Sequence, residues 1–428
     1  MKLKHICLIA CLLVSGLATA RTAAAQGTIK VGILHSLSGT MAISETTLKD
    51  TILMMIDEQN KKGGLLGRKL EAVVVDPASD WPLFAEKARE LLEKDKVAVV
   101  FGCWTSVSRK SVLPVFEKDN GLLFYPVQYE GEESSKNVIY TGAAPNQQAI
   151  PAVDYLMKEV GVKRWVLEGT DYVYPRTTNK ILEAYLKAKG VADADISINY
   201  TPFGHADWQT RVAAIKRFGS AGKKTAVVST INGDANVPFY KELGNQKISA
   251  EDIPVVAFSV GEEELSGLDA KPLVGHLAAW NYFESINTPT NKDFIAKWKT
   301  YIKKPNRTTN DPMEAHYIGF NLWAQAVTKA KSTDVEKVLA VLPGLETPNL
   351  TGGMAKLLPN HHITKPVYIG EIRADGQFDV VWKSMGTVPG DAWSDYLPVS
   401  KDTEADWVTL KCGNYNSKTK ACSGQNYK

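Results

Sequence analysis

Aromatic and hydrogen-bonding side chains gather in short segments that directly follow apolar runs of the chain. The segment Gly102–Ser106 follows the run Val97–Phe101 and carries a tryptophan, a threonine and a serine. The segment Tyr125–Glu130 follows Leu122–Phe124 and carries two tyrosines, a glutamine and a glutamate. Aromatic walls with a few uncharged polar groups suit a small, neutral, polar ligand, so these segments are candidates for a binding site.

The apolar runs read as strands, because they alternate with segments of helical periodicity. After the run Ile29–Leu34, for example, Leu48, Ile52 and Met55 recur on one helical face. Strands that alternate with helices predict parallel sheets with right-handed crossovers, and the pattern runs twice along the 428 residues. We therefore predict an α/β protein with two Rossmann-like, parallel-sheet lobes. Ligands bind beyond the carboxyl ends of such strands, which selects the loops Ser36–Thr40, Gly102–Ser106, Tyr125–Glu130, Gly169–Tyr174, Thr230–Asp234 and Ser259–Glu264.

Two helix starts are well marked. Asp80 is predicted to cap one helix, and Asp311–Glu314 reads as a capping box with proline in the first turn. Since the second helix follows the second round of the pattern, we expect the chain to cross back and pack it on the first lobe. The expected domains are a signal peptide at 1–25, lobe one at 26–145 and about 282–345, lobe two at 146–281 and about 346–395, and a tail at 396–428.

The N-terminus has the order of a cleavable secretory signal. A basic start, Met1–Lys4, precedes the short apolar stretch Ile6–Val14 and small residues that end near Ala25. Cleavage there would remove three basic and no acidic residues, so the formal charge would fall from +3 to zero. We expect a periplasmic protein that offers no basic surface to nucleic acid. No later stretch is apolar for long enough to predict a membrane span.

Three cysteines follow the predicted signal. Cys412 and Cys422 stand ten positions apart in a polar tail, and in an oxidising periplasm we expect a disulfide between them, with two free thiols as the alternative. Cys103 is left without a partner. The neighbours His361 and His362 would face opposite ways in a strand, so no metal is expected, and nothing in the sequence calls for a cofactor.

Several motifs resemble one family. They include Gly102–Lys110, Tyr125–Gly131, Tyr140–Gln147, Gly169–Arg176, Asn232–Val237, Ser259–Glu264 and Asp311–Ala315. Together they look like the urea- and short-amide-binding branch of the periplasmic binding proteins, within the leucine-binding-protein-like superfamily, and the resemblance runs from about Gly27 to about Pro398. It implies type I lobes joined by three hinge crossings, closure around the ligand, and delivery of that ligand to ABC transporter permease subunits in the inner membrane.

The resemblance also implies roles for individual residues. Trp104 and Ser106 would face the ligand from lobe one, while Tyr172 and Tyr174 would close on it from lobe two. Where the family's amide sensor carries threonine and then proline, this chain has Val127 and Gln128, which suggests a second amide-seeking group. The expected ligand-binding residues are Trp104, Ser106, Tyr125, Gln128, Tyr129, Glu130, Asp171, Tyr172, Tyr174, Asn232, Gly233 and Ser259.

Urea presents one carbonyl acceptor and four N–H donors, so a buried site must supply both donors and acceptors. An amino acid would need an ammonium partner as well, and Glu130, Asp171 or Glu262 leaves branched-chain amino acid binding open. A ligand sensor for a membrane receptor is a further alternative. In another class, a secreted amide hydrolase would use Cys103 as nucleophile, with Glu130 and Lys110 on nearby loops. We expect a binding protein without catalytic residues.

Overall fold

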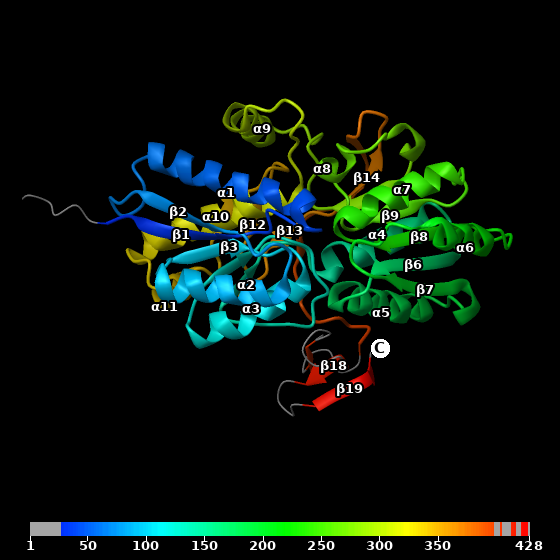
Figure 1. Ribbon diagram of the computed structural model, residues 1–428, viewed down its shortest axis with the longest axis horizontal. Coiled ribbons are helices and arrows are strands. Elements are labelled where there is room, and N and C mark those ends of the chain that lie inside the picture. The colour runs from blue at the N-terminus through cyan, green and yellow to red at the C-terminus, as the bar shows by residue number, and fades with distance from the viewer. Residues whose placement is uncertain (1–26, 398–402, 405–411, 417–420, 427–428) are drawn as a thin grey trace, which may run out of the picture.

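The computed structural model describes residues 27–397, 403–404, 412–416 and 421–426. In this part of the chain two α/β lobes lie side by side, with blue, cyan and yellow segments in one and green segments in the other (Figure 1). The predicted two-lobe α/β fold is confirmed. None of the helices within these ranges is long and apolar enough to cross a membrane. The predicted signal peptide, 1–25, lies outside the described residues.

Lobe one is built on a five-stranded parallel sheet of order β2-β1-β3-β4-β5. Its strands are β1 (Ile29–Leu34), β2 (Leu70–Val75), β3 (Val99–Gly102), β4 (Leu123–Tyr125) and β5 (Val138–Tyr140). The helices of this lobe are α1 (Ala42–Lys61), α2 (Trp81–Arg89), α3 (Ser106–Lys118), α9 (Pro289–Ile302), α10 (Asp311–Ala330) and α11 (Val335–Val341). The middle strand β3 is buried along its whole length, as a strand covered on both faces should be.

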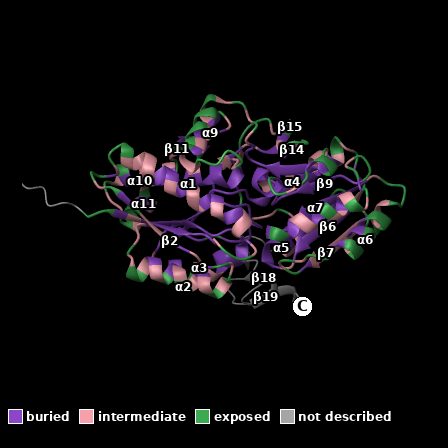
Figure 2. Cartoon of the chain, turned by 45° about the horizontal axis from the view of Figure 1, so that its top comes forward, coloured by how far each residue is buried: buried purple, intermediate pink, exposed green. Residues whose placement is uncertain are grey.

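Lobe two is built on a seven-stranded sheet of order β15-β14-β10-β9-β8-β6-β7. Its strands are β6 (Arg164–Thr170), β7 (Ile196–Thr201), β8 (Thr225–Thr230), β9 (Val255–Ala257), β10 (Leu277–Trp280), β14 (Tyr368–Ile372) and β15 (Phe378–Lys383). The last two strands are antiparallel additions at one edge. The helices are α4 (Ala149–Lys158), α5 (Val173–Ala188), α6 (Gln209–Gly219), α7 (Asn236–Asn245) and α8 (Glu262–Leu265). In both lobes the inner strands are buried, whereas the edge strands β2, β7 and β15 are partly exposed, and the helices turn their exposed residues outward (Figure 2).

The chain crosses between the lobes after β5, after β10 and before β14. The third crossing comes later than the position near 345 that the sequence indicated. Leu350, Leu357 and Ile363 still belong to the core of lobe one, because these apolar side chains are buried together with its sheet. The short strands β11 (Glu346–Pro348) and β12 (Met354–Lys356) therefore go with lobe one, and β13 (Thr364–Lys365) pairs with β16 (Val388–Pro389) beside the crossing.

The two predicted caps have different outcomes. Asp80 caps α2 as expected, since its carboxylate accepts from the backbone N–H of Leu83 at 2.8 Å. At α10 the cap is Asn310, whose side chain accepts from the N–H of Met313 at 3.2 Å, and Asp311 is already the first helical residue. The prediction of Asp311 as the capping residue is wrong by one position. Its carboxylate instead accepts from the N–H of Asn281 at 2.9 Å, next to the second crossing.

The tail forms three short strands, β17 (Thr403–Glu404), β18 (Cys412–Asn416) and β19 (Ala421–Asn426). In the antiparallel backbone pairing Cys422 lies opposite Tyr415, and Cys412 lies opposite Asn426. The side chains of these strands lie outside the described residues, so the disulfide between Cys412 and Cys422 stays a prediction.

Gly142 follows β5 and packs directly against the backbone of the loop after β4. A Cβ atom at Gly142 would lie 2.0 Å from the carbonyl oxygen of Val127, which is backbone and has little room to move. We expect Gly142→Ala to lower the free energy of unfolding by about 2 kcal/mol or more, measured by thermal unfolding. At Gly267, which has no positive φ and no atom within 4 Å of the place a Cβ would take, alanine should change the free energy of unfolding by less than about 0.5 kcal/mol. Equal melting temperatures for the two variants would contradict this account.

Candidate ligand-binding site

The loops at the carboxyl ends of the two sheets meet between the lobes, which are in direct contact. Gln128 Nε2 of lobe one donates to Ser259 Oγ of lobe two at 2.7 Å. The indole N–H of Trp104 points to Asn232 Oδ1 across the same interface, at 3.4 Å. Of the twelve predicted ligand-binding residues, all but Asp171 are buried. The structure is therefore a closed arrangement in which water has little access to these side chains.

Gly233 marks the closest approach of the two backbones. Its φ is +68°, in the left-handed region, and a Cβ there would lie 2.6 Å from the carbonyl oxygen of Thr40 in lobe one. The neighbouring N–H of Asp234 donates to that same oxygen at 3.2 Å. Glycine is required at this position because both the backbone conformation and the lack of space exclude a side chain.

Behind the interface, lobe one holds a cluster of four buried charges: Arg109, Lys110, Glu130 and Glu133. Arg109 Nε donates to Glu133 at 2.7 Å and Arg109 Nη2 to Glu130 at 3.3 Å, while Lys110 donates to Glu133 at 2.8 Å. Burial alone would raise the pKa of Glu133, but Arg109 and Lys110 lower it well below its usual value. Two cations balance two carboxylates, so the cluster is neutral as a whole.

Three aromatic rings surround this cluster. The guanidinium of Arg109 lies 4.6 Å from the ring centres of both Tyr125 and Tyr129, and the Tyr140 hydroxyl donates to Glu133 at 2.7 Å. Such contacts let a guanidinium remain charged away from water. Burial raises the pKa of Glu130, and the charges of Arg109 and Lys110 oppose that rise.

Lobe two contributes tyrosines to the same place. Tyr172 lies close enough to Tyr125, Glu130 and Arg109 for their charges to act on its pKa, which burial raises well above the usual value. Tyr172 and Tyr174 pack with Val107 of lobe one in a small buried cluster. The Tyr174 hydroxyl lies beside Gln128 and Ser259, yet neither it nor Gln128 Oε1 has a hydrogen-bond partner.

Two of the predicted residues point elsewhere. Asp171 is partly exposed and pairs with Arg176 at 2.5 Å, on the lobe-two side of the interface. Tyr129 faces the hinge, where its hydroxyl meets His362 Nε2 at 2.5 Å and its ring stacks on that of Tyr140. Neither side chain lies at the contact between the lobes, so their predicted contacts with a ligand find no support in this geometry.

Sequence reasoning missed two charged residues behind the contact surface and one contact at its edge. Arg109 stands three residues after Ser106 on α3, and this helical spacing could have placed it beside that serine. Glu133 follows an irregular loop, where no periodicity indicates which side chains turn inward. At the edge of the interface, Trp81 of lobe one meets Phe203 of lobe two with ring centres 5.3 Å apart, and no sequence pattern announces that contact.

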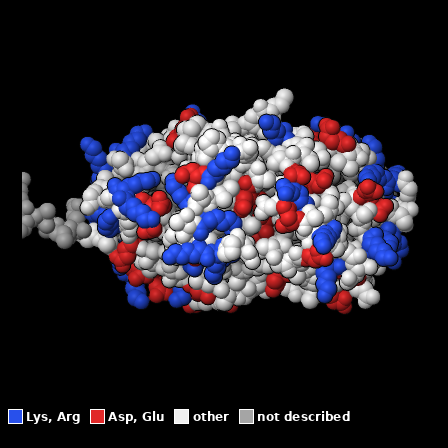
Figure 3. Space-filling model, turned by 90° about the horizontal axis from the view of Figure 1, so that it is seen from above, with Lys and Arg blue, Asp and Glu red and all other residues white. Residues whose placement is uncertain are grey.

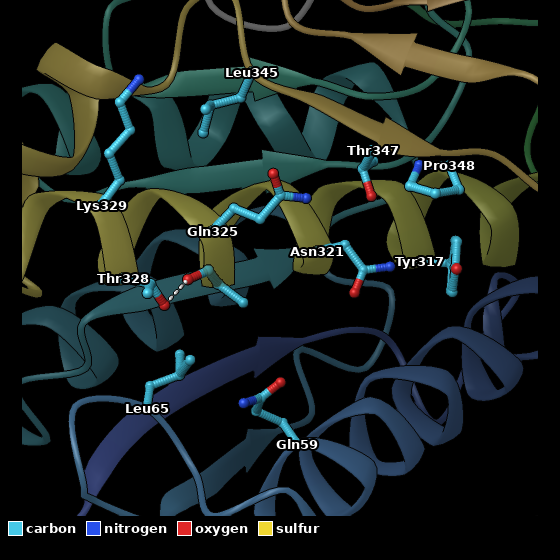
Figure 4. Close-up of a pocket in the computed structure, with 11 residues that line it drawn as sticks. Gln59, Leu65, Tyr317, Asn321, Gln325, Thr328, Lys329, Leu345, Thr347 and Pro348 are labelled. Carbon is cyan, nitrogen blue, oxygen red and sulfur yellow. Dashed lines mark hydrogen bonds between the residues drawn. The ribbon is translucent and has the colours of Figure 1, made fainter.

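Other features of the surface lie apart from this site. A groove of about 570 Å³ runs between α1, α10 and β11 within lobe one, and Tyr317, Asn321 and Gln325 of α10 point into it (Figure 4). It shares no residue with the predicted ligand set. Basic and acidic side chains are mixed across both lobes on the face in Figure 3. Within the described ranges, no group of three or more His, Cys, Asp or Glu residues is placed to hold a metal ion.

Comparison with known families gives one match along most of the chain. The model for the family described as "Periplasmic binding protein domain" matches residues 29–399. Among curated relatives, "Leu/Ile/Val-binding protein homolog 6" of Brucella melitensis is 23% identical over 82% of this chain and 90% of its own length. A "Limonene hydroxylase" of Geobacillus stearothermophilus is 32% identical, but over only 28% of this chain and 22% of that protein.

Solved structures share the fold at low sequence identity. A solute-binding protein of an ABC transporter from Rhodopseudomonas palustris, in complex with p-hydroxybenzoic acid, has a TM-score of 0.72 and 21% identity, over 85% of this chain and 98% of that one. At this level of identity the likeness extends to the fold alone.

The buried charge cluster makes a sharp prediction about stability. Arg109→Met leaves Glu130 and Glu133 buried with only Lys110 to balance them, and we expect the free energy of unfolding to fall by about 3–5 kcal/mol in thermal unfolding. As a control, Arg373→Met removes an arginine whose pairs with Asp375 and Asp379 are exposed, and it should cost less than about 1 kcal/mol. Similar losses in the two variants would show that the buried cluster contributes no more to the free energy of unfolding than an exposed ion pair does.

Proposed function

The chain belongs to the family of periplasmic binding protein domains, and we propose that it captures urea or a short aliphatic amide between its lobes. We further propose that it is periplasmic and hands this ligand to the permease subunits of an ABC transporter in the inner membrane. Support for the transporter comes from the family match and from structural neighbours described as ABC transporter solute-binding proteins. Support for the location comes from the family and from the predicted signal peptide.

One observation carries the choice of ligand. Gln128 Oε1 and the Tyr174 hydroxyl are buried on opposite lobes, at residues near each other, and neither atom has a hydrogen-bond partner within the described residues. An unpaired buried polar atom costs about 1–3 kcal/mol, so a ligand that pairs both atoms would stabilise the closed form. An amide does so, because its N–H can donate to Gln128 and its carbonyl can accept from Tyr174.

The charges around the site favour a neutral ligand. An amino acid needs a carboxylate for its ammonium group, and two of the three candidates named from the sequence are engaged by arginines: Glu130 by Arg109 and Asp171 by Arg176. The third, Glu262, accepts the backbone N–H of Glu284 with Oε1 at 2.7 Å, and its buried Oε2 has no partner within the described residues. Burial raises the pKa of Glu262 well above its usual value, which disfavours the charged carboxylate that an ammonium group needs. Arg109 is likewise engaged by two carboxylates and is not free to bind a ligand's carboxylate.

Two alternatives remain as outcomes of experiment. The relatives named as Leu/Ile/Val-binding proteins favour a branched-chain amino acid as the second candidate ligand. The hydrolase hypothesis is disfavoured by the surroundings of Cys103, because its thiol is fully buried and burial raises its pKa, away from the reactive thiolate. Ammonia release from urea or acetamide that Cys103→Ala abolishes would establish the hydrolase instead.

Closure would couple capture to delivery. A ligand that pairs groups on both lobes binds the closed form better than the open form and shifts the population toward it. The contacts between Gln128 and Ser259 and between Trp104 and Asn232 exist only when the lobes meet, so the closed shape is available for a transporter to recognise.

The test is isothermal calorimetry of the mature chain, refolded to remove any ligand carried through purification, against urea, acetamide and leucine. Urea has four heavy atoms, and at about 1.5 kcal/mol each its dissociation constant should lie on the order of tens of micromolar. Tyr174→Phe should weaken binding by about ten-fold or more, because the ligand's carbonyl loses its donor.

Tyr240→Phe is the matched control. Tyr240 is also a buried tyrosine of lobe two whose hydroxyl has no partner, but it belongs to the core beneath α7 rather than to the interface. Its replacement should leave the affinity for urea unchanged. Saturable binding of leucine with no binding of either amide would leave the fold intact and overturn the proposed ligand.

A further inference from the structure

The hydroxyl group of Ser106 is fixed by two neighbours in the buried charge cluster. Ser106 Oγ donates its proton to Glu130 Oε2, and Arg109 Nη1 donates to Ser106 Oγ at 3.2 Å. A hydroxyl has one proton and two lone pairs. With the proton given to Glu130 and one lone pair taken by Arg109, Ser106 has one lone pair left. Toward a ligand it can therefore accept a hydrogen bond and cannot donate one.

Its neighbours on lobe one have the same polarity. The Tyr125 hydroxyl, beside Ser106, donates its proton to the carbonyl oxygen of Trp104 at 2.5 Å and keeps lone pairs as its remaining capacity. Gln128 donates one of its two N–H groups to Ser259, and its Oε1 has no hydrogen-bond partner within the described residues and can accept. On the opposite lobe, the Tyr174 hydroxyl has a proton with no acceptor. The lone pairs of Ser106 and Tyr125 and the free Gln128 Oε1 thus make the unused capacity of lobe one mainly that of an acceptor, opposite a tyrosine hydroxyl that can donate.

From this arrangement we infer that Glu130 is a specificity-determining residue: by holding the Ser106 proton, it makes lobe one select ligands that present N–H groups to it. The inference rests on the proposed function and deepens it. It assigns the orientation of the ligand, with its amino group toward lobe one and its carbonyl toward Tyr174. Urea and primary amides fit this pattern. A carboxylate such as acetate has no N–H group, so its oxygens would face the acceptor atoms of lobe one and be repelled.

Glu130 acts through Ser106, as a positioning residue, and its own placement is secured by Arg109. Because the guanidinium only donates, the oxygen that faces Arg109 Nη2, at 3.3 Å, must remain an acceptor in any substitute. In Glu130→Gln the amide oxygen would therefore face Arg109, and the amide N–H₂ would face Ser106. Ser106 would then accept from Gln at this position and turn its proton toward the ligand, which reverses its polarity without changing its size.

The experiment measures calorimetric affinities of the full mature chain for urea, acetamide and acetate. Glu130→Gln should weaken urea and acetamide binding by at least about ten-fold, since a donor then faces the ligand's N–H. The preference for acetamide over acetate should shrink by the same factor or more. In a Ser106→Ala background, where there is no hydroxyl to reverse, Glu130→Gln should change the affinity by less than about two-fold.

Glu133→Gln is the matched control. Glu133 is equally buried and shares Arg109, but it bonds to Lys110 and Tyr140 rather than to Ser106. This variant should lower the melting temperature, while the affinity for urea stays within about three-fold of the wild type. The comparison separates the polarity of Ser106 from a general loosening of the charge cluster.

Each outcome decides a different point. Loss of urea affinity in Glu130→Gln that is abolished by Ser106→Ala and absent in Glu133→Gln supports the inference. Wild-type amide binding with equal losses in Glu130→Gln and Glu133→Gln, or with an unchanged acetamide-to-acetate preference, overturns the inference alone. A wild type that binds neither urea nor acetamide overturns the proposed function, and this inference with it.

Discussion

Where the two lobes meet and exclude water, each polar atom buried between them must find a partner, and the rest of the site follows from this constraint. The protein meets part of it alone, through Gln128 with Ser259 and Trp104 with Asn232. It leaves Gln128 Oε1 and the Tyr174 hydroxyl unpaired. Each unpaired buried atom costs about 1–3 kcal/mol, and we propose that a ligand which pairs both atoms stabilises the closed form.

The uncharged side chains Ser106, Tyr125 and Gln128 of lobe one lie in front of a buried cluster of two cations and two carboxylates whose charges balance. Arg109 links the Ser106 side of the cluster to Glu133, and the aromatic rings of Tyr129 and Tyr140 carry the packing on to His362. His362 lies in the segment just before β13, beside the third crossing. The side chains that would contact the ligand and the crossing beside His362 thus belong to one packed network. A substitution in one part is therefore expected to alter the packing of the other.

The alternation of strands and helices predicted the two sheets because buried parallel strands are apolar throughout and the helices between them keep one apolar face. The order of the strands also placed most of the twelve candidate residues at one interface. What the sequence could not determine was direction: Asp171 and Tyr129 stand in the right loops but turn to Arg176 and to His362. The sequence also could not show how far lobe one extends, because the segment Leu350–Ile363 has no periodicity that would assign it to the core of lobe one rather than to that of lobe two.

A neighbour at 21% identity that shares this fold holds p-hydroxybenzoic acid, whereas we propose urea or a short amide for this chain. The sheets cannot account for that difference, because they are common to both. The difference must come from side chains at the strand ends and from what holds their protons. In this chain a hydroxyl that could either donate or accept is committed by the buried carboxylate of Glu130. If Ser106 contacts the ligand as we propose, ligand choice depends on this pair, because burial makes the position of a single proton costly to change.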